Sequence, residues 1–441
     1  MHISWQLIVL SLAYVGVLFI IAWQGDRNTA SFGGVRASRW VYPLSIGVYA
    51  TSWTYYGAVG SAAAHGWEFM PIYVGPILVF IFGWPIISKF NAVVKTHRIG
   101  SLADFMSARY GRSHSLAILT TLVALLGTIP YIALQLKAVG QTFNIMAGSP
   151  TGTEPSVFDT AFFAAIFLTI FAILFGTRLP GQRRDSNRGM MIAIAFESIV
   201  KLIAFVLVGL FCTFQLFDGF DDLFILARQD PAVATVFSTN FSQWGLATQL
   251  VLASLAILCL PRQFHVTFVE SPDEERYRNN ARWIFPLYLL GFIIFVVPIA
   301  AAGLLKFGGL APPDAFVLLL PMAYNNEPLA ALAFLGGLSA ATGMILVSTL
   351  ALAIMVANEL LLPLLFRSSS EELRERRDLS WITVMVRRLS IIGIMALAWL
   401  YYQSATSERS LASIGLVAFV AAAQFAPALL GGLYWRQGNQ Y

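Results

Sequence analysis

Ionisable side chains inside long apolar stretches are the residues of this sequence best placed to do chemistry. Glu197 and Lys201 lie four positions apart in the apolar stretch 188–216, so they share one face of a helix and can pair. Lys137 lies in a second apolar stretch, 114–146. Because a charge in lipid is costly, such residues usually face one another or a water-filled cavity. Glu197 and Lys201 can form a structural ion pair, or Glu197 can carry a proton, and the sequence leaves both roles open. Lys137 can pack between helices or contact a substrate, and these two roles also stay open.

A second group of polar residues follows a proline. The apolar stretch 244–268 contains Pro261, with Arg262, Gln263 and His265 close behind it. Proline removes a backbone donor and interrupts a helix, and freed carbonyls at membrane depth are tolerated only beside protein or a water-filled cavity. A lone histidine is more often a packed residue than a ligand. The combination of a break with arginine, glutamine and histidine instead favours a binding site.

Hydroxyl groups and aromatic rings are concentrated in a third apolar stretch, 41–63, where we expect Gly57 and Gly60 to loosen the helix. The alternative for this segment is helix packing through small residues. Gln135 adds a polar group to the stretch that carries Lys137. The candidate substrate-binding residues from these segments are Tyr49, Thr51, Ser52, Trp53, Tyr55, Gln135, Arg262, Gln263 and His265.

The elements that must position these residues are membrane helices. Of the 441 residues, 58% are hydrophobic and 12% are charged, about half the charged share of an average soluble protein. This composition excludes a set of soluble domains. Two cysteines inside apolar runs, Cys212 and Cys259, exclude a disulfide scaffold. The basic residues are not interleaved with aromatic ones, so we expect no nucleic-acid partner.

Eleven apolar stretches are long enough to cross the hydrocarbon layer, which takes roughly 20 residues. The first lacks the basic start and small-residue cleavage site of a signal peptide, so we expect residues 1–24 to form a retained transmembrane helix. The stretches are 4–23, 41–63, 69–88, 114–146, 157–178, 188–216, 244–268, 282–305, 329–362, 381–402 and 409–434.

Lysine and arginine residues predict the orientation of these helices. In one set of alternate loops there are 22 of the 28 basic residues, and in the opposite, acidic set there are three. Cytoplasmic loops carry the excess of basic residues. We therefore expect a multi-pass protein of a bacterial-type cytoplasmic (inner) membrane, with the N-terminus outside and the C-terminus in the cytoplasm.

The two irregular stretches occupy matching positions. After the first helix is set aside, they are the first and the sixth of ten, and two sets of five helices have opposite orientations. Interrupted helices in matching positions of inverted halves indicate a transporter's binding site near the midplane. We place the first half at 41–217, an external loop at 218–243, the second half at 244–435 and a cytoplasmic tail at 436–441.

Four segments resemble the sodium:solute symporter family, which includes the sodium/proline and sodium/glucose transporters. The resemblance implies an all-α membrane fold of about 11 transmembrane helices, with a LeuT-like five-plus-five inverted repeat after one N-terminal helix. The segments are 99–111 (from Ile99 to Gly111), 129–135, 260–264 and 336–341.

Residues 49–60 and 424–435 are similar, more closely still, to the symporter-like membrane domain of sensor histidine kinases of the CbrA type. That resemblance implies binding and translocation of an amino acid, histidine first. The alternative is a solute-sensing input domain that signals to a C-terminal kinase domain and a response regulator. The 441 residues contain no kinase histidine box, glycine-rich ATP site or catalytic spacing. We therefore expect no enzyme activity and no cofactor or metal.

The sequence departs from the family at its sodium site. The family uses hydroxyl groups of the eighth core helix, and by an alignment on Asn358 and Glu359 those positions are Met344 and Ile345. These side chains are poor ligands for a hard cation that prefers oxygen. We therefore expect sodium independence. Glu197 falls where relatives often have an aspartate, so the resemblance makes it the candidate proton carrier. This leaves proton coupling through Glu197, with Lys201 setting its charge state, or no coupling.

Overall fold

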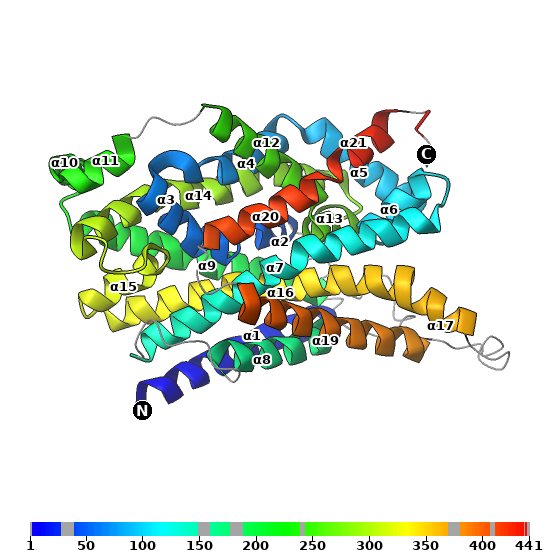
Figure 1. Ribbon diagram of the computed structural model, residues 1–441, viewed down its shortest axis with the longest axis horizontal. Helices are drawn as coiled ribbons and strands as arrows, with labels where there is room; N and C mark the ends of the chain where they lie inside the picture. The colour runs from blue at the N-terminus through cyan, green and yellow to red at the C-terminus, as the bar shows by residue number, and fades with distance from the viewer. Residues whose placement is uncertain are drawn as a thin grey trace.

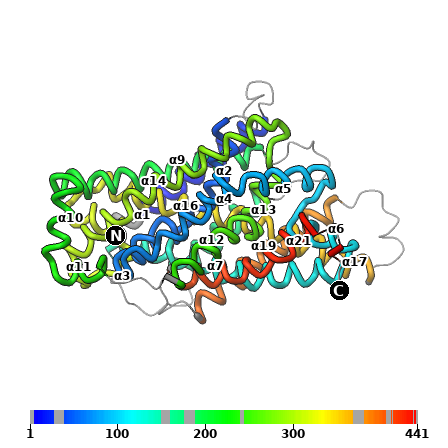
Figure 2. Tube along the Cα trace, turned by 90° about the horizontal axis from the view of Figure 1, so that it is seen from above, coloured from blue at the N-terminus to red at the C-terminus, as the bar shows by residue number. Residues whose placement is uncertain are grey.

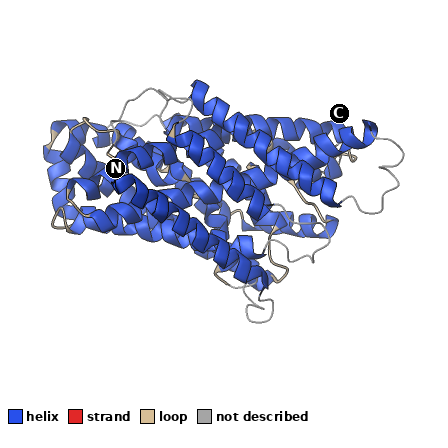
Figure 3. Cartoon of the chain, turned by 90° about the horizontal axis from the view of Figure 1, so that it is seen from below, coloured by secondary structure: helices blue, strands red, loops and turns tan. Residues whose placement is uncertain are grey.

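The computed structural model describes residues 2–27, 39–148, 159–176, 188–238, 243–368, 380–405, 411–435 and 437–438. Within these ranges all regular secondary structure is helical and there is no strand (Figure 3). The all-α prediction is therefore confirmed.

Seven helical segments are each long and apolar enough to cross a membrane. They match the predicted stretches 4–23, 114–146, 188–216, 282–305, 329–362, 381–402 and 409–434. The 33-residue helix α7, for example, is about 50 Å long at 1.5 Å per residue. The helices concerned are α1 (His2–Arg27), α7 (His114–Met146), α9 (Arg188–Phe214), α14 (Glu275–Phe307), α16 (Glu327–Val356), which continues into η6 (Ala357–Leu361) and α17 (Leu362–Ser368), α19 (Ser380–Ala405), and α20 (Leu411–Ala423) with α21 (Ala426–Tyr434).

The other four predicted stretches are short or broken. Counting each bent pair of helices as one span raises the number of candidate spans to nine in the described ranges. The stretch 157–178 is described only as the shorter apolar helix α8 (Thr160–Gly176). The stretch 244–268 bends by 51° between α12 (Gln243–Cys259) and the unit formed by α13 (Pro261–Phe264) and η4 (His265–Val269).

The first part of the chain is more interrupted than its hydropathy predicts. The stretch 41–63 consists of α2 (Val41–Ile46), η1 (Gly47–Tyr49), η2 (Trp53–Gly57) and α3 (Ala58–His65). Next come η3 (Gly66–Phe69), α4 (Pro71–Ile81) and α5 (Trp84–His97), so the predicted helix 69–88 is divided near Gly83. The short helix α6 (Leu102–Arg109) follows, with Leu102, Phe105 and Met106 buried.

The long helices lie side by side, and the described chain begins and ends at opposite ends of the bundle (Figure 1). The short helices α10 (Phe220–Gln229) and α11 (Pro231–Ser238) lie at the end near α3, whereas α6 and α17 lie at the other end (Figure 2). The first two belong to a loop predicted to be external and the last two to loops predicted to be cytoplasmic. The two predicted sets of loops are therefore separated in space.

Helix α9 is central and packs against α16, α14, α1 and α2. The N-terminal helix α1 lies on one side of the bundle with α8, where Phe19 contacts Phe171 and Phe175.

Two breaks interrupt the helices that carry the polar segments. Leu260 is extended (φ −63°, ψ 129°), because the residue before a proline is pushed out of the helical region. Ala50 is also extended (φ −74°, ψ 97°), although no proline follows it. Each break precedes a π-helical turn, at Trp53–Gly57 and at His265–Val269.

Gly60 makes room for a neighbouring element, which the sequence did not predict. The helix opens at Ala50, before either glycine. A Cβ on Gly60 would lie 1.8 Å from Asp314 Oδ1, so Gly60 makes room for the carboxylate of the short turn η5 (Pro313–Ala315), which leads into α15 (Phe316–Ala323).

Candidate substrate site

The first break is held against α7 by two side chains one helical turn apart. Tyr131 Oη lies 2.9 Å from Thr51 Oγ1, and the backbone N–H of Ser52 donates to Gln135 Oε1 at 3.0 Å. Gln135 Nε2 in turn donates to the carbonyl of Tyr131 at 3.3 Å. These bonds replace part of the helical ladder that the break removes, and they fix the orientation of Tyr131.

Arg262 follows the second break and points into the same region. Its guanidinium carbon lies 4.4 Å from the centre of the Tyr131 ring, and the side chain is 1% exposed. Within the described part of the chain, none of its three guanidinium nitrogens has a hydrogen-bond partner, and neither does the side-chain amide of Gln263. Buried polar groups are nearly always satisfied. Unsatisfied donors at this place are therefore available to a ligand.

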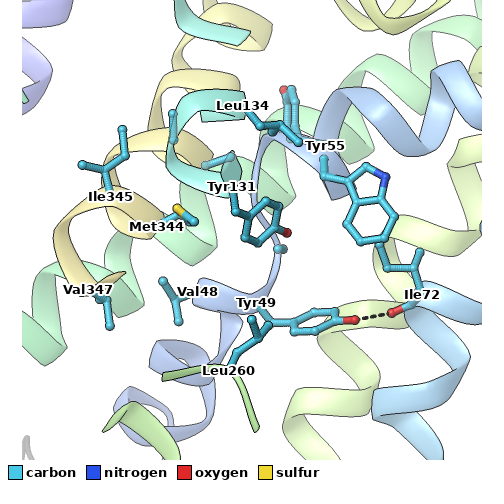
Figure 4. Close-up of a cluster of buried hydrophobic side chains, with 14 of the residues drawn as sticks. Val48, Tyr49, Tyr55, Ile72, Tyr131, Leu134, Leu260, Met344, Ile345 and Val347 are labelled. Carbon is cyan, nitrogen blue, oxygen red and sulfur yellow. Dashed lines mark hydrogen bonds between the residues drawn. The ribbon is translucent and has the colours of Figure 1, made fainter. Parts of the chain in front are cut away.

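Four aromatic rings surround this point, and we call them the aromatic cluster: Tyr49, Trp53, Tyr131 and Phe419. Phe419 of α20 lies 4.8 Å from Trp53, 6.1 Å from Tyr49 and 6.2 Å from Tyr131, measured between ring centres. The hydroxyl of Tyr49 donates to the carbonyl of Ile72 at 2.7 Å, which holds the ring in place (Figure 4). The cluster therefore offers ring faces and edges beside a free guanidinium.

A cavity of about 150 Å³ lies against the outer side of the cluster. Trp53 and Phe419 line it, but Tyr131 and Arg262 do not. It extends toward the end of α3, which is the predicted external end. Trp53 and Phe419 therefore belong both to the cavity wall and to the aromatic cluster. The other polar residues along its wall are Ser61, His65, Glu68, Gln249 and Ser413.

Two predicted site residues are engaged elsewhere. Tyr55 donates its hydroxyl to the carbonyl of Ala333 in α16 at 3.1 Å, and its ring packs on Tyr56 and Phe205. His265 Nε2 lies 3.5 Å from Glu270 Oε1, and both side chains are buried. The structure thus brings Tyr49, Thr51, Ser52, Trp53, Gln135 and Arg262 to one region, and gives Tyr55 and His265 other partners. Gln263 is buried beside Arg262 in the sequence, and its side chain has no hydrogen-bond partner in the described structure.

Glu197 and Lys201 are both buried, and in the described structure each forms a hydrogen bond with another element of the chain. Glu197 Oε1 accepts a hydrogen bond from Thr342 Oγ1 of α16 at 2.5 Å, while Lys201 Nζ donates to the carbonyl of Ala50 at 2.7 Å. A Cβ on Gly343 would lie 2.5 Å from Glu197 Oε2, so this glycine admits the carboxylate to the surface of α16. Each side chain is drawn to a partner on another helix.

Met344 and Ile345 are fully buried on α16. Met344 points toward Tyr131 and the broken segment, whereas Ile345 points away (Figure 4). The Met344 sulfur accepts a hydrogen bond from Ser348 Oγ at 3.5 Å. Neither position supplies an oxygen ligand to the break.

Lys137 has Asp314 as its charged neighbour. Asp314 Oδ2 accepts a hydrogen bond from the backbone N–H of Leu411 at 3.3 Å, so it connects η5 with the start of α20. Burial raises the pKa of Asp314 to about 6, against the smaller opposing effects of the Leu411 N–H and Lys137.

Tyr131, Phe419 and Thr342 belong to the site region but were not predicted as site residues. Tyr131 had a signal, because it precedes Gln135 by four residues and therefore shares its helical face. Phe419 and Thr342 come from distant helices, and no local pattern connects them with Arg262 or Glu197.

No protein-family model matches the chain. The uncharacterised symporter YhjB of Bacillus subtilis is 24% identical over 285 residues, which are 64% of this chain and 54% of the relative. The uncharacterised symporter YodF of the same organism is 25% identical over 262 residues, 56% of this chain and 48% of the relative. The chain thus spans about half the length of the curated relatives it matches.

Among solved structures, a substrate-bound, outward-open Na+-coupled sialic acid symporter superposes with a TM-score of 0.70 at 14% identity, covering 98% of this chain and 88% of that one. A manganese transporter of Eremococcus coleocola superposes with a TM-score of 0.51 at 14% identity, and the superposition covers 92% of this chain and 79% of the transporter. These likenesses show the fold alone. The chain is a multi-pass membrane protein with the fold of a LeuT-like transporter, and its sequence relatives are symporters.

Proposed function

We propose that the chain binds an amino acid through its carboxylate at Arg262 and translocates it, with histidine as the first candidate. The observation that carries the proposal is the buried, unpartnered guanidinium beside the aromatic cluster. Arginine holds a carboxylate with two parallel hydrogen bonds, which would satisfy donors that are otherwise left without partners.

The charges of the region support an anionic group on the ligand. Lys201 has two charged neighbours, Glu197 and Arg262. Two cations and one carboxylate leave a net positive charge, and a buried charge without compensation is costly. A substrate carboxylate at Arg262 would balance it.

The aromatic cluster supports the choice of histidine. Rings prefer edge-to-face or offset-stacked partners with centres about 4.5–7 Å apart. An imidazole next to Trp53 and Phe419 would fit this preference, and its amino acid carboxylate would then face Arg262. The ligand's carboxylate rests on the Arg262 guanidinium, whereas the amino acid class and histidine itself rest on the resemblance to the sensor-kinase membrane domain.

The coupling ion proposed here is the proton, carried by Glu197, and sodium is not required. The buried apolar side chains of Met344 and Ile345 support the proposal that sodium is not required. Glu197→Gln keeps the shape of the side chain but cannot ionise. We expect this variant to fold, bind and exchange substrate but to lose accumulation driven by a pH gradient. Accumulation that survives in a well-folded variant would leave Glu197 a structural role only.

Isothermal titration calorimetry with purified protein tests the binding site. L-histidine, L-proline and sialic acid serve as probes, and the variant Arg262→Lys keeps the charge but loses the planar fork. We expect L-histidine to bind to the wild type and much less tightly to Arg262→Lys. Arg188→Met is the matched control, because Arg188 is a buried arginine at the start of α9. Equal binding to Arg262→Lys and the wild type would place the site elsewhere.

A solute-sensing input domain for a histidine kinase and response regulator is the second candidate, and it would use the same binding residues. The two functions differ in the step after binding. A sensor binds L-histidine but does not move it across a membrane, so binding without uptake into proteoliposomes would favour the sensor.

A further inference from the structure

A second cavity, of about 430 Å³, lies at the end of the bundle where α10 is found (Figure 2). Its wall is built by the end of α9, by α10, by the end of α14 and by the residue that follows α15. The volume is within the range of about 300–1,000 Å³ that small-molecule sites occupy, so the cavity has room for a ligand. The lining residues that matter here are Leu216, Leu226, Asp230, Leu305, Lys306 and Tyr324.

The cavity lies where two membrane helices leave the apolar layer. The apolar stretch 188–216 ends at Leu216 and the stretch 282–305 ends at Leu305, and both residues line the cavity. Lys306 follows directly, and Tyr324, another lining residue, is exposed. Tyrosine rings and lysine side chains near helix ends are typical of the boundary between the hydrocarbon layer and the lipid headgroups. The cavity is therefore at the depth of the headgroups.

The charged residues of the lining are one lysine and one aspartate. Lys306 Nζ lies 4.7 Å from the centre of the Tyr324 ring, and in the described part of the chain it makes no hydrogen bond. Asp230 Oδ1 accepts the N–H groups of Ala232 and Val233 at 2.9 and 3.2 Å and so caps α11. The other carboxylate oxygen makes no hydrogen bond to a described residue. A ligand with one anionic group, one ammonium group and an apolar part would match this lining.

We propose that this cavity binds the headgroup of a phospholipid with a primary ammonium group, a phosphatidylethanolamine. The lipid phosphate accepts from Lys306, the ammonium group donates to Asp230, and the first part of the acyl chains lies on Leu216 and Leu305. Charge complementarity selects this headgroup. An anionic headgroup would leave one negative charge over, because Lys306 and Asp230 balance each other, and a trimethylated nitrogen has no N–H group to donate. The site is separate from the substrate region and goes beyond the proposed function.

The test is native mass spectrometry of the delipidated full chain in detergent, with the unfolding temperature as a second measurement. The probes are phosphatidylethanolamine, phosphatidylcholine and phosphatidylglycerol with identical oleoyl chains, and free phosphoethanolamine. Wild type should retain one phosphatidylethanolamine at a lipid concentration about tenfold below that needed for the other two lipids, which is the effect of one charge-assisted hydrogen bond. This lipid should also raise the unfolding temperature most. Free phosphoethanolamine should do neither, because it has no apolar part.

Two variants each remove one charge from the cavity. Asp230→Asn keeps an oxygen that can cap α11, and Lys306→Gln keeps a hydrogen-bond donor. Each should weaken the retention of phosphatidylethanolamine about tenfold. Asp230→Asn should also lose the preference over phosphatidylcholine, whereas Lys306→Gln should keep it. The matched control is Lys89→Gln, because Lys89 Nζ lies 3.8 Å from the centre of the Tyr434 ring and belongs to α5, away from this cavity; it should bind the lipid as the wild type does.

Equal retention of the three lipids by the wild type would overturn the proposal, because it would show only loosely held bilayer lipid. Unchanged retention of phosphatidylethanolamine by both Lys306→Gln and Asp230→Asn would place the lipid elsewhere and would overturn it too. Free phosphoethanolamine that binds as tightly as the lipid would show a site for a soluble ligand, which also contradicts the proposal. No amino acid is used in these measurements, so their outcome does not depend on the Arg262 site.

Discussion

Replacing Arg262 by methionine distinguishes a binding arginine from a structural one, because the two roles predict opposite changes in stability. The guanidinium stacks on Tyr131, with its carbon atom 4.4 Å from the centre of the ring. Such cation–π contacts are worth about 0.5–2 kcal/mol. Exchanging buried ionic groups for apolar ones of similar volume is often neutral, or stabilising by about 1–4 kcal/mol. The free energy of unfolding of Arg262→Met should therefore stay unchanged or rise by about 1–3 kcal/mol.

Binding should change in the opposite direction. A carboxylate at Arg262 would receive two charge-assisted hydrogen bonds of about 1.5–3 kcal/mol each. Losing both weakens the affinity by about 3–6 kcal/mol, which is roughly a hundredfold to ten-thousandfold in Kd.

The assay is chemical unfolding in detergent together with calorimetric titration of L-histidine, with Arg188→Met as control. Arg262→Met should be at least as stable as the wild type and fail to bind. A variant that loses more than about 3 kcal/mol, the loss expected when a buried charge pair is broken, and still binds would show that the arginine is structural.

Three further perturbations test the Glu197 pocket, the Asp314 carboxyl and the aromatic cluster. Gly343→Ala places a Cβ 2.5 Å from Glu197 Oε2, so the free energy of unfolding should fall by about 1–3 kcal/mol. The control Gly393→Ala, whose Cβ would have no atom within 4 Å, should leave this free energy almost unchanged. The pKa of Asp314 is raised to about 6 from its ordinary 3.8, so the folded protein holds this proton more tightly than the unfolded chain. Stability should fall as pH rises from about 4 to about 6, and Asp314→Asn should remove this part of the slope; an unchanged slope would contradict the assignment. Phe419→Ala removes a ring that lines the cavity and packs on Trp53 in the aromatic cluster, so L-histidine should dissociate faster in stopped-flow measurements; an unchanged rate would show that this ring does not retain the ligand.

Hydropathy was sufficient to predict the long helices, and proline chemistry was sufficient to predict the second break. Leu260 is extended because it precedes Pro261. The break at Ala50 has no such local cause. It is stabilised by Lys201, which is 151 positions away, and by the contact of Ser52 with Gln135, which is 83 positions away. Contacts of this range cannot be recognised from a single sequence.

The candidate site was partly predictable for similar reasons. Trp53 and Arg262 come from the two predicted breaks, and both lie beside Tyr131 in the structure; that they bind substrate stays a prediction. Tyr55 follows Trp53 by two positions, and residues at that spacing do not share a helical face, so its hydroxyl meets α16 instead. Helical spacing allowed Glu197 and Lys201 to pair, but spacing alone could not show that Thr342 and Ala50 would take their polar atoms.

The most direct test of amino acid transport through Arg262 is uptake of radiolabelled L-histidine into proteoliposomes under an inward proton gradient. We predict accumulation by the wild type that is equal in sodium and choline chloride, and none by Arg262→Met. Accumulation by Arg262→Met at the wild-type rate, or a drop of about tenfold when choline replaces sodium, would contradict the proposed function.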